Sequence, residues 1–309
     1  MFESIGFWIL FHLFLLAMIY IDLKVFHRDT SKVTLKSSSL CCLFWISIAL
    51  CFNSLIASEL GFDAALTFFT AYLLESSLSI DNLFLFLVVF SFFQIKIQYQ
   101  HRVLFLGILG ALVFRLSFIL LGVTLLEAFE WMYILFGAFL CFSAACFFWE
   151  KNEKKELKNS LLVKWANSLF RVYEGDHRGR FFVKIRGKRY VTTLFLALFL
   201  IEIFDIIFAV DSVPAVLAIT SNVFLAYTSN VFAVLGLRSF YFLLAHLKEK
   251  FQYLKTAIAF ILFFVGIKLI LIPFYAIPSR WTFIYIVSAI TLAIAISLVR
   301  KKKTESQGK

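Results

Sequence analysis

Residues 202–216 read EIFDIIFAVDSVPAV. This stretch places three carboxylates, Glu202, Asp205 and Asp211, and then Pro214, inside an otherwise apolar run. One charged side chain at the centre of a bilayer costs about 2.5–3.5 kcal/mol even on the least severe scale. Three acids beside a helix-breaking residue therefore indicate a functional site within a membrane protein.

The composition supports this class. The chain has 309 residues, of which 62% are hydrophobic and 16% charged, whereas soluble domains are about 45–50% apolar and about 25% charged. The five cysteines all lie in apolar stretches and lack metal-binding spacing, which predicts buried thiols. The leader MFESIG contains no Lys or Arg, so we expect the first apolar run to stay as a membrane helix.

A helix needs about 20 apolar residues to cross a bilayer. Nine apolar runs meet this requirement, which predicts an all-α polytopic membrane protein with about nine transmembrane helices. The runs are residues 5–22, 40–57, 64–92, 103–125, 131–149, 192–218, 228–246, 253–274 and 281–299.

Basic residues set the expected orientation. Of the 30 Lys and Arg residues, 26 fall in the segments 23–39, 93–102, 150–191 and 247–255 and in the tail from Arg300. These segments alternate with the others, and cytoplasmic loops carry the excess of basic residues. We therefore expect the N-terminus outside and the C-terminus in the cytoplasm of a bacterial cell, with the net charge of +11 at the anionic leaflet rather than on nucleic acid.

The long loop, 150–191, begins with a charge run and ends in FFVKIRGKRYV. We favour a solvated basic connector for this loop. The alternation around Arg186-Gly187-Lys188 leaves a small hairpin or an interfacial flap as the alternative.

A second acidic motif resembles the first. LLESSLSIDNLFLF (73–86) has Glu75 six residues before Asp81-Asn82, and IFDIIFAVDSVPAV (203–216) has Asp205 six residues before Asp211-Ser212. Each motif is followed by a span with glycine and one intramembrane arginine, Arg115 or Arg238. Because the two motifs run in opposite directions through the membrane, spans 3–5 and 6–8 are predicted to be inverted-topology repeats with a site at their interface.

This pattern gives the predicted organisation. It comprises two N-terminal helices (1–63), a first repeat (64–149), the basic cytoplasmic loop (150–191), a second repeat (192–275), and a last helix with a basic tail (276–309).

The helices that carry the acids are predicted to be interrupted. Pro214 lacks an N–H, so the Val210 carbonyl loses its helical donor, and an unsatisfied carbonyl in hydrocarbon costs several kcal/mol. In a regular helix Asp211 also lies about 100° away from the face shared by Asp205 and Ser212. We therefore expect broken helices near 79–82 and 210–214, which would let these groups converge.

The chemistry of the acids predicts a cation. Five intramembrane acids and three intramembrane bases leave a formal charge of −2, which suits one divalent cation or two protons. Carboxylate, amide, hydroxyl and backbone oxygens are hard ligands that suit Mg²⁺, Ca²⁺ or Mn²⁺. The predicted metal ligands are Glu75, Asp81, Asn82, Asp205, Val210 (carbonyl), Asp211 and Ser212, and the predicted charge-balancing or gating residues are Arg115, Arg238, Lys268, Glu202 and Pro214. For Lys268 taken alone, snorkelling and a salt-bridge partnership are equal alternatives.

Three segments carry a resemblance to a known family. ESSLSIDN (75–82), EIFDIIFAVDSVPA (202–215) and SNVFAVLGLRSFYF (229–242) resemble the TerC family of membrane proteins. The family takes its name from tellurium resistance, and the resemblance implies Mn²⁺ efflux from the cytoplasm, with the two acidic motifs carrying the ion. The chain departs from the family at 221–223, where Ser-Asn-Val replaces an acidic residue and proline, and in FSAACFF (142–148), which lacks a lysine.

The leading hypothesis is a Mn²⁺ exporter of the cytoplasmic membrane, not an enzyme, with Ca²⁺ as an alternative ion and proton exchange as the driving force. No tightly bound cofactor is expected, and the partners are the metal and the bilayer, with contact to the secretion machinery left open. One alternative is a membrane scaffold that delivers metal to exported proteins. Another is an intramembrane aspartyl protease using Asp81 and Asp211, although the Gly-x-Gly-Asp pattern of those enzymes is missing.

Overall fold

A computed structural model describes residues 5–21, 34–149, 170, 172–173, 179–185, 187–247, 254–275 and 277–307. At some helical positions only the backbone is described, and Asp81 is one of these. The elements are α1 (Ile5–Ile21), α2 (Leu35–Leu60), α3 (Phe62–Phe92), α4 (Ile97–Ala128), α5 (Trp131–Trp149), β1 (Val172–Tyr173), β2 (Phe182–Ile185), β3 (Lys188–Thr192), α8 (Thr193–Leu217), α9 (Val223–Leu247), α10 (Leu254–Leu271) and α11 (Ser279–Gln307).

Each predicted apolar run overlaps one of these helices, so the all-α polytopic class is confirmed, whereas the number of nine membrane spans stays a prediction. Five helices, α2, α4, α8, α9 and α11, are long and apolar enough to cross a membrane. The apolar helices α1, α5 and α10 are shorter. Helix α3, with 31 residues, has the length to cross and carries the first acidic motif.

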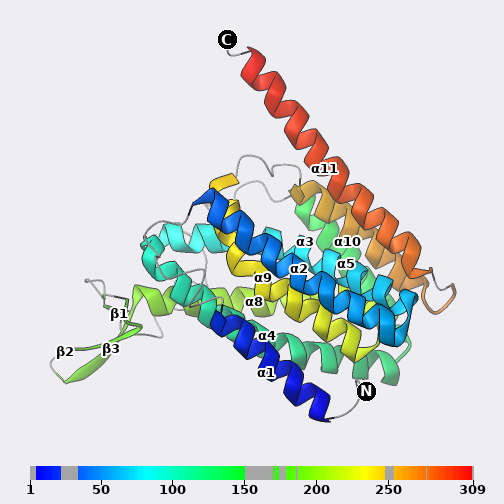
Figure 1. Ribbon diagram of the computed structural model, residues 1–309, viewed down its shortest axis with the longest axis horizontal. Helices are drawn as coiled ribbons and strands as arrows, with labels where there is room; N and C mark the ends of the chain where they lie inside the picture. Colours follow the sequence, from blue (N-terminus) through cyan, green and yellow to red (C-terminus); the bar gives the residue numbers. More distant parts are fainter. Residues whose placement is uncertain are drawn as a thin grey trace.

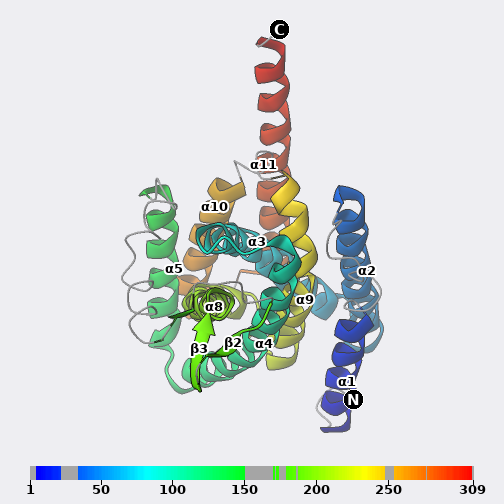
Figure 2. The same ribbon diagram turned by 90° about the vertical axis from the view of Figure 1, so that its left-hand side faces the viewer.

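The helices form a bundle around α9 (Figures 1 and 2). Helix α9 packs against α3, α2 and α4, while α8 packs against α4 and α3, and α5 packs against α10. Almost all of α9 is buried, whereas α11 is mostly exposed along the outside of α3 and α10. Helix α1 is joined to α9 by a hydrogen bond of 3.0 Å between His12 Nε2 and the Tyr227 hydroxyl.

The predicted helix breaks are wrong. Helix α3 is continuous through 79–82, and α8 is continuous through 210–214 with Pro214 inside it. Proline removes only one hydrogen bond, and Pro214 lies in the last turn, where its own carbonyl still accepts from Ala218 N at 2.9 Å. The helix therefore keeps its form past the proline and ends at Leu217, instead of unwinding beside Asp211.

The end of the basic loop forms a hairpin. Strands β2 and β3 pair antiparallel from Phe182↔Val191 to Ile185↔Lys188, and Gly187 at the turn has φ +79°, a conformation that favours glycine. The Thr192 hydroxyl donates to the Arg180 carbonyl at 2.8 Å. The favoured connector is thus wrong for this part, and the hairpin alternative is confirmed; the charge run at 150–158 lies outside the described residues.

The cysteine prediction is confirmed only in part. Cys41 and Cys42 are buried, Cys141 and Cys146 are half-buried, and Cys51 is exposed on α2. None of these five cysteines forms a disulfide in the described structure.

Candidate functional site

A buried ion pair joins the first acidic motif to α4. The Arg115 guanidinium on α4 donates through Nη1 to the Glu75 carboxylate on α3, and the two side chains are 2% and 0% exposed. The Ser79 hydroxyl, one turn along α3, donates to the same carboxylate oxygen at 3.4 Å. Removing one partner of such a pair leaves an uncompensated charge, which is strongly destabilising, so these residues are held together.

Arg115 also faces the second acidic motif. Asp205 on α8 is 5% exposed and interacts electrostatically with the Arg115 guanidinium. Glu75 and Asp205 hold equivalent positions in the two motifs, and α8 packs against both α3 and α4. One buried cation is thus shared by two acids, which leaves this trio with a formal charge of −1 when all three groups are ionised.

Glu202 lies one turn before Asp205 on α8 and fits against a glycine. A Cβ placed on Gly110 of α4 would overlap the Glu202 carboxylate. The carboxylate interacts electrostatically with Asp205, and its buried Oε2 has no hydrogen-bond partner among the described residues. Gly110 therefore makes room for a second carboxyl group beside Asp205 on α8.

Asp211 contacts a different helix. Its Oδ1 accepts a hydrogen bond of 2.7 Å from the Ser143 hydroxyl on α5, and the side chain is half-buried. The neighbouring Ser212 is buried, and its hydroxyl has no hydrogen-bond partner among the described residues. The Val210 side chain is exposed on the outer face of α8.

The packing of α4 on α8 gives the relative levels of these groups. A Cβ on Gly110 would meet Glu202, and a Cβ on Gly122 would meet Val213 and Leu217. The two helices therefore run parallel with a nearly constant offset, which places Arg115 level with Asp205.

Helix α3 runs antiparallel to α4 because a short turn connects them, so it is also antiparallel to α8 (Figure 1). Asp81 lies six residues beyond Glu75, and Asp211 lies six residues beyond Asp205. At 1.5 Å per residue, each second acid lies about 9 Å from the central pair, in opposite directions. The acids of the two motifs therefore occupy three levels along the bundle.

The levels of the acids along the bundle can be compared with the predicted site shared by Asp81 and Asp211. The Asp81 side chain is outside the described part of the chain, so direct pairing of Asp81 with Asp211 remains a prediction. The helix register does not favour it, because regular helices do not bring these two positions together. Asn82, the residue after Asp81, is buried on α3.

The remaining predicted residues are buried cations. Arg238 is buried on α9, and Lys268 is buried on α10. Within the described chain, Lys268 forms no ion pair with an acidic residue. Two residues before it, Gly266 packs against Gly137 of α5, where an added Cβ would lie 2.8 Å from the Gly137 carbonyl oxygen. This close approach keeps the Lys268 segment against α5.

No complete metal cage is formed by the described side chains. Among them, no group of three or more His, Cys, Asp or Glu residues lies close enough to hold a metal. The described site holds carboxylates at several levels of the bundle, with one arginine paired to Glu75.

Two polar residues of the bundle were missed by the sequence analysis. Ser143 is the partner of Asp211, and its only signal is a hydroxyl in the apolar segment FSAACFF. Asn230 on α9 is 1% exposed, and neither atom of its amide has a hydrogen-bond partner among the described residues. The sequence did offer a signal for Asn230 as a candidate residue, because it stands in the segment 229–242 that carries the family resemblance.

Comparisons with known proteins agree with the fold and the motifs. The profile described as "Integral membrane protein TerC family" matches residues 60–306. The uncharacterized membrane protein STKORF319 of Myxococcus xanthus is 39% identical over 302 residues, which cover 97% of this chain and 94% of that protein. A protein of Escherichia coli (strain K12) named putative membrane-bound redox modulator Alx is 40% identical over 270 residues, or 84% of each chain.

A further relative, an uncharacterized membrane protein of Rickettsia bellii (strain RML369-C), is 37% identical over 300 residues, covering 97% of this chain and 99% of that one. No solved structure matches the chain. The family profile covers both acidic motifs, the arginine spans and the hairpin, and the relatives align over most of the length. The chain therefore belongs to the TerC family of integral membrane proteins.

Proposed function

We propose that the protein exports a divalent cation, with Mn²⁺ favoured, from the bacterial cytoplasm. The observation that carries this proposal is the buried Arg115 guanidinium, which is paired with Glu75 and interacts electrostatically with Asp205. Two equivalent acids from two helices share one fixed cation, and Glu202 adds a third carboxyl group beside them. Carboxylate and hydroxyl oxygens are the ligands that hard divalent cations prefer.

The packing of the helices supports an inverted-repeat organisation. If α3, α4 and α5 are exchanged with α8, α9 and α10, the contact of α3 with α9 becomes the contact of α8 with α4. Both contacts are present, and the pairs α5–α10, α3–α8 and α4–α9 each map onto themselves and are also present. This reciprocity is expected of two repeats related by a pseudo-two-fold axis in the membrane plane.

In the proposed mechanism the three levels of acids form the path of the ion. Asp81 with Asn82 lies on the side of the hairpin, which we assign to the cytoplasm. Glu75, Asp205 and Glu202 lie near the centre, and Asp211 with Ser143 lies toward the outside. An arriving cation would displace Arg115 from the central acids, and Arg115 would return when the ion leaves. Rocking of one repeat against the other would expose the two sides in turn, and protons taken up by the acids would balance the charge.

The test is Mn²⁺ transport by the purified protein in liposomes, with an internal Mn²⁺-quenched dye. Asp211→Asn keeps the size of the side chain but removes its charge, so we expect Mn²⁺ flux to fall at least about tenfold. A matched control is Asp63→Asn, which changes an exposed acid in the first turn of α3 and should leave the flux unchanged.

The outcomes separate the rival functions. Equal flux through wild type, Asp211→Asn and protein-free liposomes would refute the exporter and favour the membrane scaffold, which moves no metal by itself. Flux of Ca²⁺ but not of Mn²⁺ would retain the mechanism and change the ion. An aspartyl protease would need Asp81 and Asp211 to share a proton, which the helix register does not favour.

A further inference from the structure

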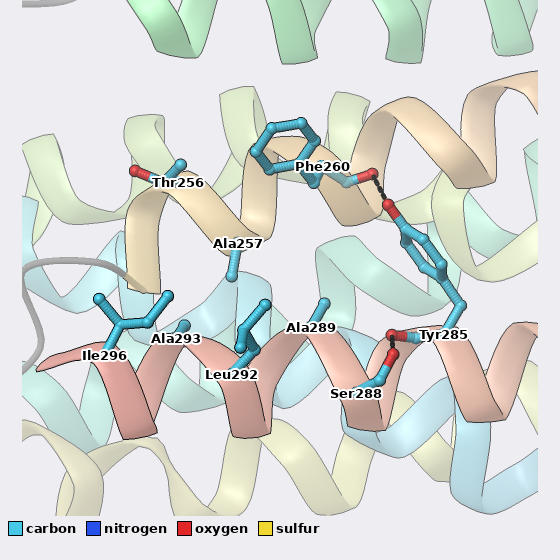
Figure 3. Close-up of a pocket in the computed structure, with 9 residues that line it drawn as sticks. All are labelled: Thr256, Ala257, Phe260, Tyr285, Ser288, Ala289, Leu292, Ala293 and Ile296. Carbon is cyan, nitrogen blue, oxygen red and sulfur yellow. Dashed lines mark hydrogen bonds between the residues drawn. The ribbon is translucent and has the colours of Figure 1, made fainter. Parts of the chain in front are cut away.

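A cavity lies between α10 and α11. It has a volume of about 310 Å³ and is lined mainly by apolar side chains, with Ala257 and Phe260 on α10 and Ala289, Leu292 and Ile296 on α11 among them (Figure 3). This volume lies at the lower end of the range found for small-molecule sites. The cavity is therefore large enough for a ligand, and its walls favour an apolar one.

Two hydroxyl groups at the cavity already have hydrogen-bond partners. The Tyr285 hydroxyl donates to the Phe260 carbonyl at 3.2 Å, and the Ser288 hydroxyl donates to the Tyr285 carbonyl at 2.8 Å. The Tyr285 ring also stacks on Phe264, with 4.2 Å between ring centroids. These contacts close one end of the cavity and leave no donor there for a polar ligand.

The cavity has the length of one lipid leaflet. From Tyr285 to Ile296 the α11 axis advances about 16 Å, and half of the hydrocarbon core of a bilayer is about 15 Å. Both walls come from peripheral parts of the bundle, since α11 is mostly exposed. An acyl chain that enters from the bilayer therefore fits both the length and the polarity of this space.

The end of the cavity opposite Tyr285 is followed in the sequence by basic residues. Lys255 directly precedes the lining residue Thr256, and Arg300 to Lys303 follow Ile296 after one turn of α11. Basic clusters at the end of a membrane helix attract anionic lipid headgroups. The helical segments that carry these residues continue from the end of the cavity opposite Tyr285, where the headgroup of a bound lipid would be.

We propose that the space between α10 and α11 is a binding site for one anionic phospholipid. Its acyl chain occupies the cavity from Ile296 toward Tyr285, and its phosphate lies at the basic end of α11. The lipid fills the gap between two helices that otherwise meet only in part, and so holds α11 against the bundle.

The test is native mass spectrometry of the full chain released from nanodiscs that contain equal amounts of phosphatidylglycerol and phosphatidylcholine. We expect the wild type to retain one phosphatidylglycerol. Ala289→Phe would fill the cavity and reduce the retained phosphatidylglycerol by at least tenfold. Ala295→Phe is the matched control, since Ala295 is exposed on α11 and does not line the cavity, and it should retain the lipid.

A second variant tests the headgroup without altering the cavity. Replacing Lys301, Lys302 and Lys303 by Gln should lower the preference for phosphatidylglycerol over phosphatidylcholine by about fivefold for each lysine near the phosphate. Unchanged lipid retention in Ala289→Phe, or wild-type protein that appears as a lipid-free dimer, would overturn the proposal. None of these results depends on whether the protein transports a metal.

Discussion

The buried pair between Arg115 and Glu75 allows a quantitative test of the central site. Both side chains are almost fully inaccessible, at 2% and 0% exposed. Arg115→Leu removes the cation and leaves the Glu75 carboxylate without its partner, with Asp205 nearby on α8. Breaking a buried pair in this way costs about 3–5 kcal/mol, so we expect Arg115→Leu to lower the unfolding free energy by about that amount.

The double variant Arg115→Leu with Glu75→Gln separates two contributions to the loss of stability, the broken ion pair and the lost volume of the arginine side chain. With both charges removed, the remaining cost should fall to within about 1–2 kcal/mol of the wild type, because replacing both ions is often nearly neutral. The assay is unfolding in mixed micelles, followed by the loss of helical circular dichroism. Arg280→Leu is the control, since Arg280 is exposed at the start of α11, and it should have little effect.

The reasoning would be refuted by additive behaviour. If Glu75→Gln destabilises the protein equally in the wild type and in the Arg115→Leu background, the two residues are not coupled. The described contact would then contribute nothing to stability. A coupling energy with the expected sign but near 1 kcal/mol would mean that water reaches the pair.

Two further predictions concern helix packing and the outer acid. Gly137→Ala places a Cβ 2.6 Å from the Gly266 carbonyl oxygen, so α5 and α10 must separate at a cost of about 1–3 kcal/mol; Gly6→Ala, which meets nothing within 4 Å, is its control in thermal unfolding. Ser143→Ala removes the donor to Asp211 and should lower the unfolding free energy by up to about 1.5–3 kcal/mol, whereas Ser143→Thr, which keeps a hydroxyl, should be milder. Equal melting temperatures for Ser143→Ala and wild type would exclude a stabilising role for this bond.

Much of the fold could be predicted from the positions and lengths of the apolar runs alone. The range 131–149 coincides with α5, and the range 192–218 differs from α8 by one residue at each end. This agreement has a physical cause, because a chain in hydrocarbon must satisfy its backbone internally and so forms helices wherever it is apolar. The same rule explains why the expected breaks are absent, since an unwound segment would expose several polar groups where Pro214 exposes one.

The hairpin could be predicted only in part from the local sequence pattern. Alternation around Gly187 was visible, but the basic charge of the loop favoured a solvated connector. The decisive contacts are tertiary: Arg102 of α4 donates to the Gly179 carbonyl at 2.9 Å, and Phe182 packs on Phe195 of α8, with ring centroids 4.9 Å apart. These contacts join segments far apart in the chain, so no local pattern predicts them.

The sequence by itself determined that this is a helical membrane protein of the TerC family with acids inside its apolar segments. Acids in apolar segments are informative because charge in hydrocarbon is costly. This cost depends on the residue types themselves and not on how the helices pack. Only the tertiary structure decided that Arg115 pairs with Glu75 and interacts with Asp205, that Ser143 donates to Asp211, and that the acids occupy three levels instead of one. Helix register and packing are set by side chains that meet across the bundle, and residues such as Gly110 and Gly137 determine how closely the helices approach.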